Sequence, residues 1–589
     1  MDISNYFIGS SCIIGAAAFL ILLSLIVVLR KRLKMLINIP FFNSEDEYVL
    51  IIGLSKMAIR IAEDSRVHGK KVVFISEKDR STFTDNLVAK GVKVIYVNNI
   101  NERTLTQAGI NSATSCLVVS NDDDYNINVA NFVSDIKKKK GSKIEMNLIV
   151  HVENWYSRNL LVDQISNFST TKNLNIRFFD FHHNSAKLVY DNYPPHEYLN
   201  DETDSNDRKL ICVIGRSKTA ESFILENAIL SHFKDSQRLK ILIFSKDASA
   251  WVEALNQKFP FLKDYLNLDP IELLNNSFSG YQQWGAKFKE NVSRIDAAYF
   301  FGEEDAEVVS TALHFKQFIY NQLKNIRLIP LFVVLPDKTS IFKLLEKGSN
   351  QNTSIVEKYK NDLMIHFVRE VNDSCTYEQL ISQNHIEVQA KAINYFYSIK
   401  YEFDWLLGQH FKKNSNVALI QDLESKFLKF KVKKGKPTAQ LEAFVIESLS
   451  SYTKNSKFRV KQYFGIEESW SRVTERNKES NRYIARHLPV KRSILTELNI
   501  DEVSKDELLK NISILAPIEH NRWSAEKLIA GFSFGELPQN DAGLKSIVKN
   551  TLKIHDQLDR FDNLSHLNQE KDIDLFEIIP LLENIKKSI

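Results

Sequence analysis

One short sequence motif, whose residues could take part in ligand binding, occurs twice in the chain. Gly-x-Ser-Lys-x-Ala occurs at residues 53–58 and again at 215–220. The leading glycine permits a tight turn and a close approach of the backbone. A helix that starts at such a turn offers N–H groups and a partial positive charge, which suit a phosphate group. The hydroxyls of Ser55 and Ser217 leave two interpretations open, a contact with phosphate or a helix N-cap.

The elements around each phrase follow one pattern. An apolar run precedes the phrase, a helical pattern follows it, and a second apolar run then ends in polar residues, at Val72–Glu77 and at Ile241–Asp247. This is the first β-α-β unit of a Rossmann-type fold, and its repetition sets the architecture. The sequence therefore predicts an α/β protein with two tandem Rossmann-like parallel-sheet domains, at 46–200 and 209–372, joined by a polar linker at 201–208.

Ligands of such folds bind at the carboxyl ends of the parallel strands. Glu77 follows the first phrase at the spacing at which a carboxylate accepts a ribose hydroxyl. Both copies lack the later glycines of the nucleotide-binding fingerprint, which are serine and alanine here. For Asp122 the alternative is a solvated loop with a helix N-cap. The candidate nucleotide-binding residues are Gly53, Ser55, Glu77, Asn99, Ser120 and Asp122 in the first domain and, more weakly, Gly215, Ser217 and Asp247 in the second.

The rest of the first domain resembles a known family. The stretch from Gly91 to Ala113 contains Thr-Leu, Ala-Gly-Ile and Ala in succession, and an apolar strand ending in Asp122–Asp124 follows it. These features resemble the TrkA-N domains, the regulatory nucleotide-binding domains of potassium transporters and channels. The resemblance implies NAD or another nucleotide as a ligand rather than a redox cofactor, and pairing of such domains within one chain or between the chains of a homo-oligomer. Where the family has Gly-Asp after the third strand, this chain has Asn98-Asn99.

The remainder of the chain, 385–589, has a mostly helical pattern. The run Glu519-His-Asn-Arg-Trp523, preceded by Asn481–Arg486, resembles the RyR domain, a small helical module named after ryanodine receptors. A Lys-rich stretch at 410–462 looks like an insertion, and Asn394 stands where the family tends to have histidine. The candidate ligand residues of this RyR-like module are Asn481, Arg482, Glu519, His520, Arg522 and Trp523.

The centre of this module allows two interpretations. Glu519, Arg522, Trp523 and Glu526 have i, i+3, i+4 and i+7 spacing, so they share one face of a helix. In the first interpretation Trp523 stacks on a base and Arg522 forks a phosphate or carboxylate, while Glu519 binds ribose or base hydrogens. In the second, Arg522 bridges the two glutamates and Trp523 belongs to the core.

The N-terminus predicts a membrane anchor at 1–34. Residues 7–29 carry no charged side chain and are long enough to cross a bilayer as one helix. A basic cluster follows at 30–34, which places the N-terminus outside and the bulk of the chain in the cytoplasm, at the cell inner membrane. A cleaved signal peptide is the alternative, but it carries its basic residues before the apolar run. Four scattered cysteines fit a reducing compartment.

Several classes of chemistry have no sequence support. The chain has no phosphate-loop motif, no His-Glu-x-x-His and no nucleophile elbow, so we predict no catalytic residues and no metal site. A net charge of +4 over 589 residues gives no argument for nucleic acid.

The leading hypothesis is a membrane-anchored nucleotide sensor without enzymatic activity. Ligand binding changes the assembly of the membrane helix, as in an antiphage or stress effector that responds to a nucleotide second messenger, with a transporter or defence-system partner. One alternative is a nucleotide-binding regulatory subunit of a potassium transporter. Another is an NAD-dependent oxidoreductase, for which the sequence offers no catalytic acid or base.

Overall fold

The computed structural model describes most of the chain. The anchor predicted at 1–34 and the linker predicted at 201–208 lie outside the described part, so both stay predictions. No helix within the described ranges is long and apolar enough to cross a membrane. The described residues are 48–77, 81–140, 144–168, 173–199, 210–234, 238–273, 294–324, 329–337, 341–346, 354–382, 384–412, 414–454 and 457–589.

The chain divides into two compact units. Unit 1 consists of Met1–Val152 and Asn167–Phe178, and unit 2 of Glu153–Ser166 and Phe179–Ile589. Unit 2 therefore contains both the second sheet and the helical region that follows it. The three predicted domain ranges stay predictions.

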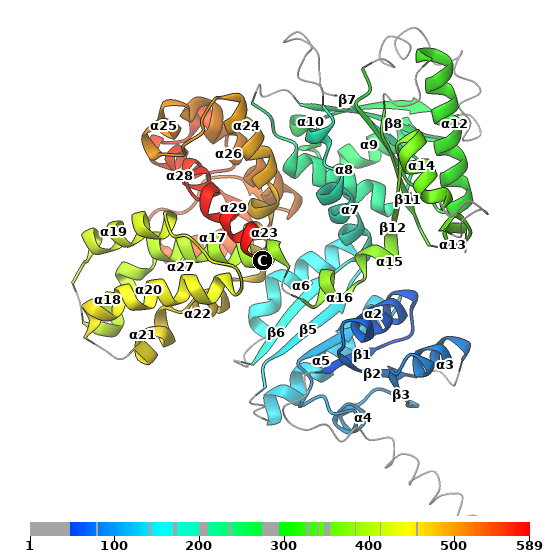
Figure 1. Ribbon diagram of the computed structural model, residues 1–589. Coiled ribbons are helices and arrows are strands. Elements are labelled where there is room, and N and C mark those ends of the chain that lie inside the picture. The colour runs from blue at the N-terminus through cyan, green and yellow to red at the C-terminus, as the bar shows by residue number, and fades with distance from the viewer. Residues whose placement is uncertain are drawn as a thin grey trace, which may run out of the picture. The chain divides into compact units, whose positions relative to one another are not determined.

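Unit 1 is built on a six-stranded sheet in the order β3-β2-β1-β4-β5-β6 (Figure 1). β1 pairs in parallel with β2 and β4, and the next pairs outward, β2 with β3 and β4 with β5, are parallel too. This is the strand order of a Rossmann fold, which confirms the first Rossmann prediction. The strands are β1 (Tyr48–Ile52), β2 (Lys71–Ser76), β3 (Lys93–Tyr96), β4 (Ser115–Val118), β5 (Met146–His151) and β6 (Leu174–Phe179). The connecting helices are α2 (Lys56–Val67), α3 (Thr82–Ala89), α4 (Glu102–Gln107), α5 (Asp123–Lys140) and α6 (Trp155–Phe168).

Unit 2 contains a second six-stranded sheet, in the order β12-β11-β10-β7-β8-β9, and all its neighbouring strands are parallel. Counted from β7, the order is the same as in unit 1, which confirms the second Rossmann prediction. The strands are β7 (Leu210–Ile214), β8 (Leu239–Ser245), β9 (Leu266–Glu272), β10 (Ala297–Phe300), β11 (Leu331–Leu335) and β12 (Ile365–Arg369). The helices are α7 (Phe181–Asn192), η1 (Pro195–Glu197), α8 (Lys218–Leu230), α9 (Ala248–Lys258), α10 (Leu262–Tyr265), α12 (Asp305–Leu323), α13 (Ile341–Glu346), α14 (Ile355–Leu363), α15 (Glu370–Ser374) and α16 (Tyr377–Leu380).

The first strand of each sheet is buried along its whole length. All five residues of β1 and all five of β7 are buried, as expected for central parallel strands that are covered on both faces. In β7, Ile211 and Val213 share a core with α7, α8 and α9, whereas Cys212 and Ile214 share a core with α12. Helices therefore cover both faces of the second sheet (Figure 1).

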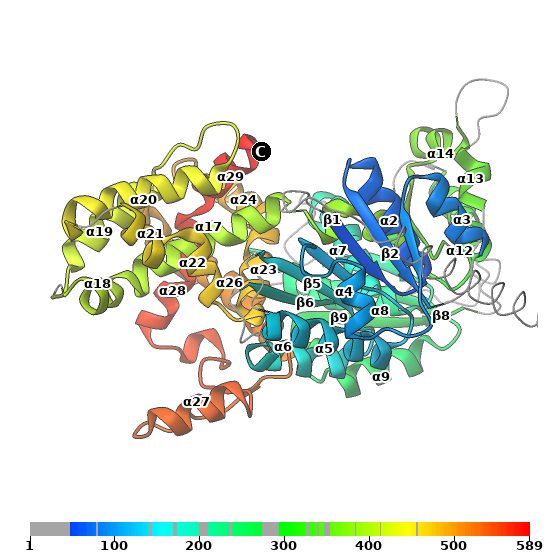
Figure 2. The same cartoon turned by 90° about the horizontal axis from the view of Figure 1, so that it is seen from below.

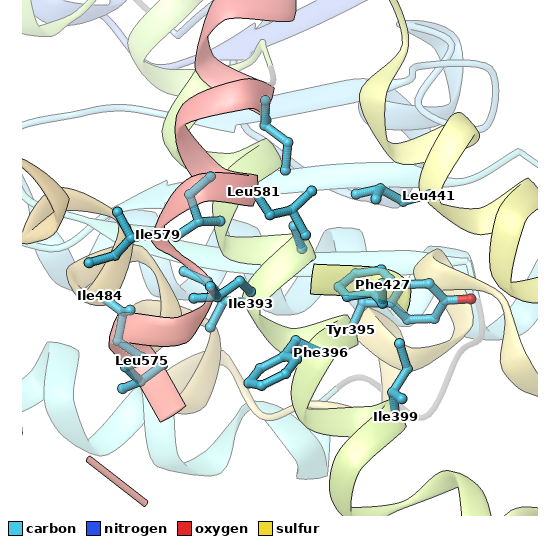
Figure 3. Packing of buried hydrophobic residues seen from close by; sticks show 14 of the residues in the cluster. Ile393, Tyr395, Phe396, Ile399, Phe427, Leu441, Ile484, Leu575, Ile579 and Leu581 are labelled. Carbon is cyan, nitrogen blue, oxygen red and sulfur yellow. The ribbon is translucent and has the colours of Figure 1, made fainter. Parts of the chain in front are cut away.

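The chain from α17 onward is mostly helical, as predicted. Ile393 of α17 packs in one cluster with side chains from α19, α20, α23, α28 and α29 (Figure 3). The stretch 410–462, expected to be an insertion, supplies α19, α20 and much of α21 to this core. The helices are α17 (His385–Tyr401), α18 (Phe403–Phe411), α19 (Val417–Leu428), α20 (Pro437–Thr453), α21 (Lys457–Phe464), α22 (Ile466–Arg472), α23 (Glu475–Arg486), α24 (Leu488–Glu497), α25 (Lys505–Lys510), α26 (Ile512–Ile529), α27 (Ala542–Asn550), η4 (Phe561–Asn563), α28 (His566–Glu577) and α29 (Ile579–Ser588), and the strands are β13 (Ser533–Phe534) and β14 (Ile554–His555).

A buried ionic network joins the second sheet to the helical region of unit 2. Glu226 of α8 is 0% exposed. Its carboxylate accepts hydrogen bonds from His183 Nε2 and from the Tyr483 hydroxyl, each at 2.7 Å. It also pairs with Arg486, which donates to Asp191 Oδ1 at 2.8 Å. Burial by itself raises the pKa of Glu226, but Arg486 and His183 outweigh it and lower the pKa to about 2. The charged carboxylate therefore holds α7, α8 and α23 together.

The strand-to-helix turns of both sheets require glycine. Gly53 has a φ of +105° and Gly215 a φ of +90°, in the left-handed region that other residues disfavour. A Cβ on Gly53 would lie 3.0 Å from the Val119 carbonyl, and a Cβ on Gly215 would lie 1.9 Å from the Phe301 oxygen. Each turn thus runs against the backbone that follows the neighbouring strand, β4 or β10.

We expect Gly215→Ala to cost far more stability than Gly53→Ala. Both changes place a Cβ at positive φ, at a cost of about 1–2 kcal/mol, but only the one at Gly215 overlaps a backbone atom outright. Gly53→Ala should lose about 1–3 kcal/mol, and unit 2 of Gly215→Ala should fail to reach its native fold. Urea unfolding followed by circular dichroism and by tryptophan fluorescence measures both. Fluorescence reports unit 2 alone, because all six tryptophans lie at or after residue 155, within unit 2, and the further transition in circular dichroism is that of unit 1. Equal losses in the two variants would contradict this account.

Candidate functional site

The candidate residues of unit 1 lie after β1, β2, β3 and β4, which are neighbours in the sheet. The carboxyl ends of parallel strands meet at one edge, where ligands of this fold bind. The structure therefore places all six along this edge, called here the unit 1 edge: Gly53, Ser55, Glu77, Asn99, Ser120 and Asp122.

Both serines of the repeated phrase are helix N-caps. Ser55 Oγ accepts a hydrogen bond from Ala58 N at 3.1 Å and donates one to the Val119 carbonyl at 2.8 Å. Ser217 Oγ accepts from Ala220 N at 3.1 Å. The hydroxyl proton of Ser55 is directed at the chain itself, so the geometry corresponds to the capping interpretation.

Glu77 is exposed and contacts both the loop after β3 and helix α5. Its Oε1 accepts a hydrogen bond from Ile100 N at 2.9 Å, which fixes the loop after β3. Burial first, and then the hydrogen bond to Glu77 and its negative charge, raise the pKa of Tyr125 in α5. Asn99, in the loop after β3, is exposed as well. The Glu77 carboxylate has several lone pairs, so it can still accept a ribose hydroxyl.

The loop after β4 is held by a residue that sequence reasoning did not select, Asn126. Its Nδ2 donates to the carbonyls of Ser120 and His151, both at 3.0 Å, and its Oδ1 accepts from Ser120 N at 2.9 Å. Asp122 Oδ1 accepts from Tyr125 N at 3.0 Å, so Asp122 caps the start of α5 while remaining exposed. An amide among the apolar, buried positions of α5 is the signal that marks Asn126.

The unit 1 edge combines groups that suit a nucleotide. The N-terminus of α2 attracts phosphate, and Glu77, Asn99 and Asp122 are exposed acceptors around it. Within the ranges that the structure describes, no group of three or more histidine, cysteine, aspartate or glutamate residues could hold a metal ion.

At the corresponding edge of the second sheet, the acidic residue is already paired. Arg216 Nη1 donates to Asp247 Oδ2, and the guanidinium carbon lies 5.9 Å from the centre of the Trp251 ring. Glu272, at the end of β9, accepts hydrogen bonds from the first two N–H groups of α9 at 3.1 and 2.9 Å. The carboxylate that the sequence pattern offers to a ligand is therefore engaged by the chain's own arginine.

This second edge also holds a buried carboxyl group that sequence reasoning missed, Glu370. It is 4% exposed, and its Oε2 lies 3.9 Å from His182 Nδ1. That nitrogen lies 2.9 Å from Thr219 Oγ1. Burial, with Asp337 and Glu303 nearby, raises the pKa of Glu370 to about 7 although its hydrogen bond with Thr219 lowers it. No local pattern marks Glu370, because its neighbours come from several separate elements.

In the C-terminal region, Arg522 is 1% exposed and paired on both sides. Its Nε donates to Glu519 Oε1 at 2.7 Å and its Nη1 to Glu526 Oε2 at 2.8 Å. Lys491 Nζ lies 2.6 Å from Glu519 Oε2. Burial opposes the charged form of Glu519, but Arg522 and Lys491 outweigh it and hold its pKa well below the usual value. Arg522 therefore bridges the two glutamates, as in the structural interpretation.

Trp523 lies differently from its neighbours on α26. It is only partly buried, and its ring centre lies 5.9 Å from that of His520 and 5.0 Å from that of His555. His520 is buried and its Nε2 donates to the Asp559 carbonyl at 2.9 Å. Trp523 thus keeps an accessible face, and the stacking interpretation stays open for it.

The two candidates on α23 are engaged in the fold. Arg482 Nε donates to Glu387 Oε2 and its Nη1 to Glu475 Oε1, each at 2.7 Å. Asn481 is buried. Of the six residues predicted for the RyR-like module, only Trp523 and Arg482 are not buried, and Arg482 is held by carboxylates.

Comparison with known proteins supports the first domain. Residues 49–165 match the TrkA-N domain family, which confirms that part of the resemblance, while the RyR resemblance stays a prediction. No curated protein matches the chain. Similar solved structures include GsuK bound to ADP (12% identity, TM-score 0.31, 57% of this chain and 69% of that chain), the human SLO3 gating ring (10%, 0.35, 56% and 81%) and a subunit of dipicolinate synthase from Bacillus halodurans (9%, 0.20, 56% and 94%).

We expect Glu370→Gln to stabilise unit 2 increasingly as pH rises. A carboxyl group whose pKa is higher in the folded than in the unfolded chain stabilises the fold fully below the unfolded value of 4.5 and loses that contribution as pH rises through about 7. Glutamine keeps the shape and cannot ionise. Its gain over wild type should be near zero at acid pH and about 3 kcal/mol above neutrality.

Urea unfolding followed by tryptophan fluorescence over this pH range measures the gain. A gain that did not change with pH would contradict the assignment of Glu370 as the titrating group.

Proposed function

We propose that the protein is a ligand-sensing regulator whose unit 1 edge binds a nucleotide. The observation that supports this most is the Gly53 turn of a TrkA-N-type sheet, which holds the start of α2 against the end of β4, with exposed Glu77 at the same edge. The helix start suits phosphate and the carboxylate suits a ribose hydroxyl. The ligand is NAD or another nucleotide, including a nucleotide second messenger, bound as a signal rather than as a redox cofactor.

Helix α6 offers a connection from the ligand to unit 2. It links β5 to β6 of the first sheet, yet its residues up to Ser166 belong to unit 2. Within unit 2, Asp163 of α6 pairs with Arg476 Nε at 2.5 Å and with Lys553 Nζ at 2.6 Å. A ligand that shifts the end of β5 would act on unit 2 through α6. The ligand can shift the equilibrium between two conformations of the protein by at most the difference between its binding free energies for them.

The output that we propose is a change in the assembly of the N-terminal segment. Residues 7–29 have the length and composition of a single-pass helix in the inner membrane, with both units on the cytoplasmic side. In a homo-oligomer, the ligand would alter how these helices cluster. Such a response suits an antiphage or stress effector.

A regulatory subunit of a potassium transporter is the second candidate, and the TrkA-N match favours it. The two candidates differ in their membrane partner. Purification from native membranes with a bound transporter would favour the second candidate, whereas a homo-oligomer alone would favour the first.

Thermal unfolding of the full chain against NAD, ATP, ADP-ribose and cyclic dinucleotides tests the nucleotide site. A ligand that binds only the folded state stabilises it by about 2.7 kcal/mol at about a hundredfold excess over Kd. Circular dichroism follows both units, whereas tryptophan fluorescence follows unit 2 alone. The ligand should raise the unfolding midpoint of the transition seen by circular dichroism but not by fluorescence, which is the transition of unit 1.

Two matched substitutions locate the ligand. Glu77→Gln keeps an oxygen acceptor for Ile100 N but removes the charge, and we expect it to abolish most of the rise. Asp247→Asn, the same change at the second sheet, should leave the rise intact. The reverse result, loss with Asp247→Asn and none with Glu77→Gln, would show that the proposal is wrong.

A further inference from the structure

The helical region carries a cationic and aromatic face that is separate from the unit 1 edge. It is formed by α26, β14, α28 and α27, and α27 stands at the edge of the helical region in Figure 2. We call it the lysine–tryptophan face: Trp523, Lys527, Lys545, Lys549, His555 and Lys571.

The aromatic part of this face is held in place. Trp523 and Lys527 are one turn apart on α26, so they share a side of the helix. The Trp523 ring meets the His555 ring edge-on, at 5.0 Å and 80°, and His520 lies at 5.9 Å. His520 in turn lies 5.9 Å from the ring of Phe561. The indole is therefore fixed in orientation while it stays partly exposed.

The cationic part is neutralised at Lys527, whose Nζ lies 3.3 Å from Glu526 Oε1, but not at Lys549. Lys549 is partly buried, and no ion pair or hydrogen bond of its ammonium group occurs within the described residues. Burial lowers the pKa of Lys549, as do Lys527, Lys545 and Lys571, whereas Asp556 raises it. Like charges that gather around a partly buried ammonium group repel one another, and an anion would relieve that repulsion.

His555 adds a neutral hydrogen-bonding group at the same place. It is 6% exposed. Burial, with Lys549 nearby, lowers its pKa to about 4 although Asp556 raises it, so the imidazole is uncharged near neutral pH. Its Nδ1 accepts a hydrogen bond from Gln557 N at 3.1 Å, which leaves Nε2 as the protonated nitrogen.

We propose that the lysine–tryptophan face binds a nucleotide with at least two phosphates. The base stacks on the accessible side of Trp523, and the phosphates lie at Lys545 and Lys549. Stacking on an aromatic side chain tolerates any base, and several lysines within reach favour a ligand with more than one negative charge. This site lies in unit 2, so it does not depend on the nucleotide site proposed for unit 1.

Calorimetric titration of the full chain with ADP and with inorganic pyrophosphate tests the proposal. It is carried out in a Glu77→Gln background, so that the unit 1 edge does not contribute. We expect ADP to bind there, and Lys545→Gln/Lys549→Gln to weaken both ADP and pyrophosphate by about tenfold or more. Trp523→Leu should weaken ADP by about tenfold and leave pyrophosphate unchanged.

The matched control is Lys431→Gln/Lys434→Gln, which removes the same charge from exposed lysines elsewhere in the helical region and should leave the affinity for ADP unchanged. ADP binding by the wild type that is lost in the Glu77→Gln background would overturn the inference while supporting the unit 1 edge, and the absence of binding in both would overturn it too. An unchanged affinity in Lys545→Gln/Lys549→Gln would overturn it as well.

Discussion

The structure depends on one steric constraint, which it meets twice. At Gly53 and at Gly215 the chain turns from a central strand into a helix so close to the neighbouring strand that a Cβ would meet its backbone. Because the turn is pinned there, the start of the helix faces the carboxyl edge of the sheet. In unit 1 exposed acceptors surround this position, whereas in unit 2 Arg216 and Asp247 of the chain pair with each other. The same glycine turn thus leaves the unit 1 edge suited to a ligand, whereas at the second sheet the chain's own arginine already engages the corresponding carboxylate.

The second sheet serves a different purpose, as the support of the helical region. Glu226 is buried with His183, Tyr483 and Arg486 around it, so α8 of the sheet and α23 of the helical region share one charge network. Removing one partner of a buried ion pair costs about 3–5 kcal/mol, because the other charge remains buried. Such a network resists separation of the two parts, and unit 2 would respond to a signal as one body.

The fold was largely predictable because its signals are local. An apolar run, a glycine turn, a helical pattern and a second apolar run specify each β-α-β unit within a few dozen residues. Helix capping is also a local contact, so the capping role of Ser55 was one of the two interpretations that the sequence allowed. The boundary between the two sheets' cores was less predictable from local signals. Helix α7 falls in the range predicted for the first domain, although its Ala186 and Val189 pack in the core of the second sheet.

The candidate sites were predictable only in part, because their decisive contacts are not local. The sequence allowed two roles for Arg522, ligand binding or a bridge between two glutamates. Lys491 of another helix helps to decide between them, because it completes the buried ion pairs. Glu370 and Lys549 take their character from groups that several separate elements supply. No spacing in the sequence indicates such contacts between distant residues. Asn126 differs, because a polar residue on the buried side of α5 can be recognised in the sequence pattern.

Amide hydrogen exchange of the full chain, with and without a nucleotide that raises its unfolding midpoint, tests the central claim most directly. The account predicts slower exchange at residues 53–59 and 119–126, the turn and the loop of the unit 1 edge, and no change at 215–221, where the second turn is engaged by its own side chains. Protection at 215–221 without protection at 53–59 would contradict it.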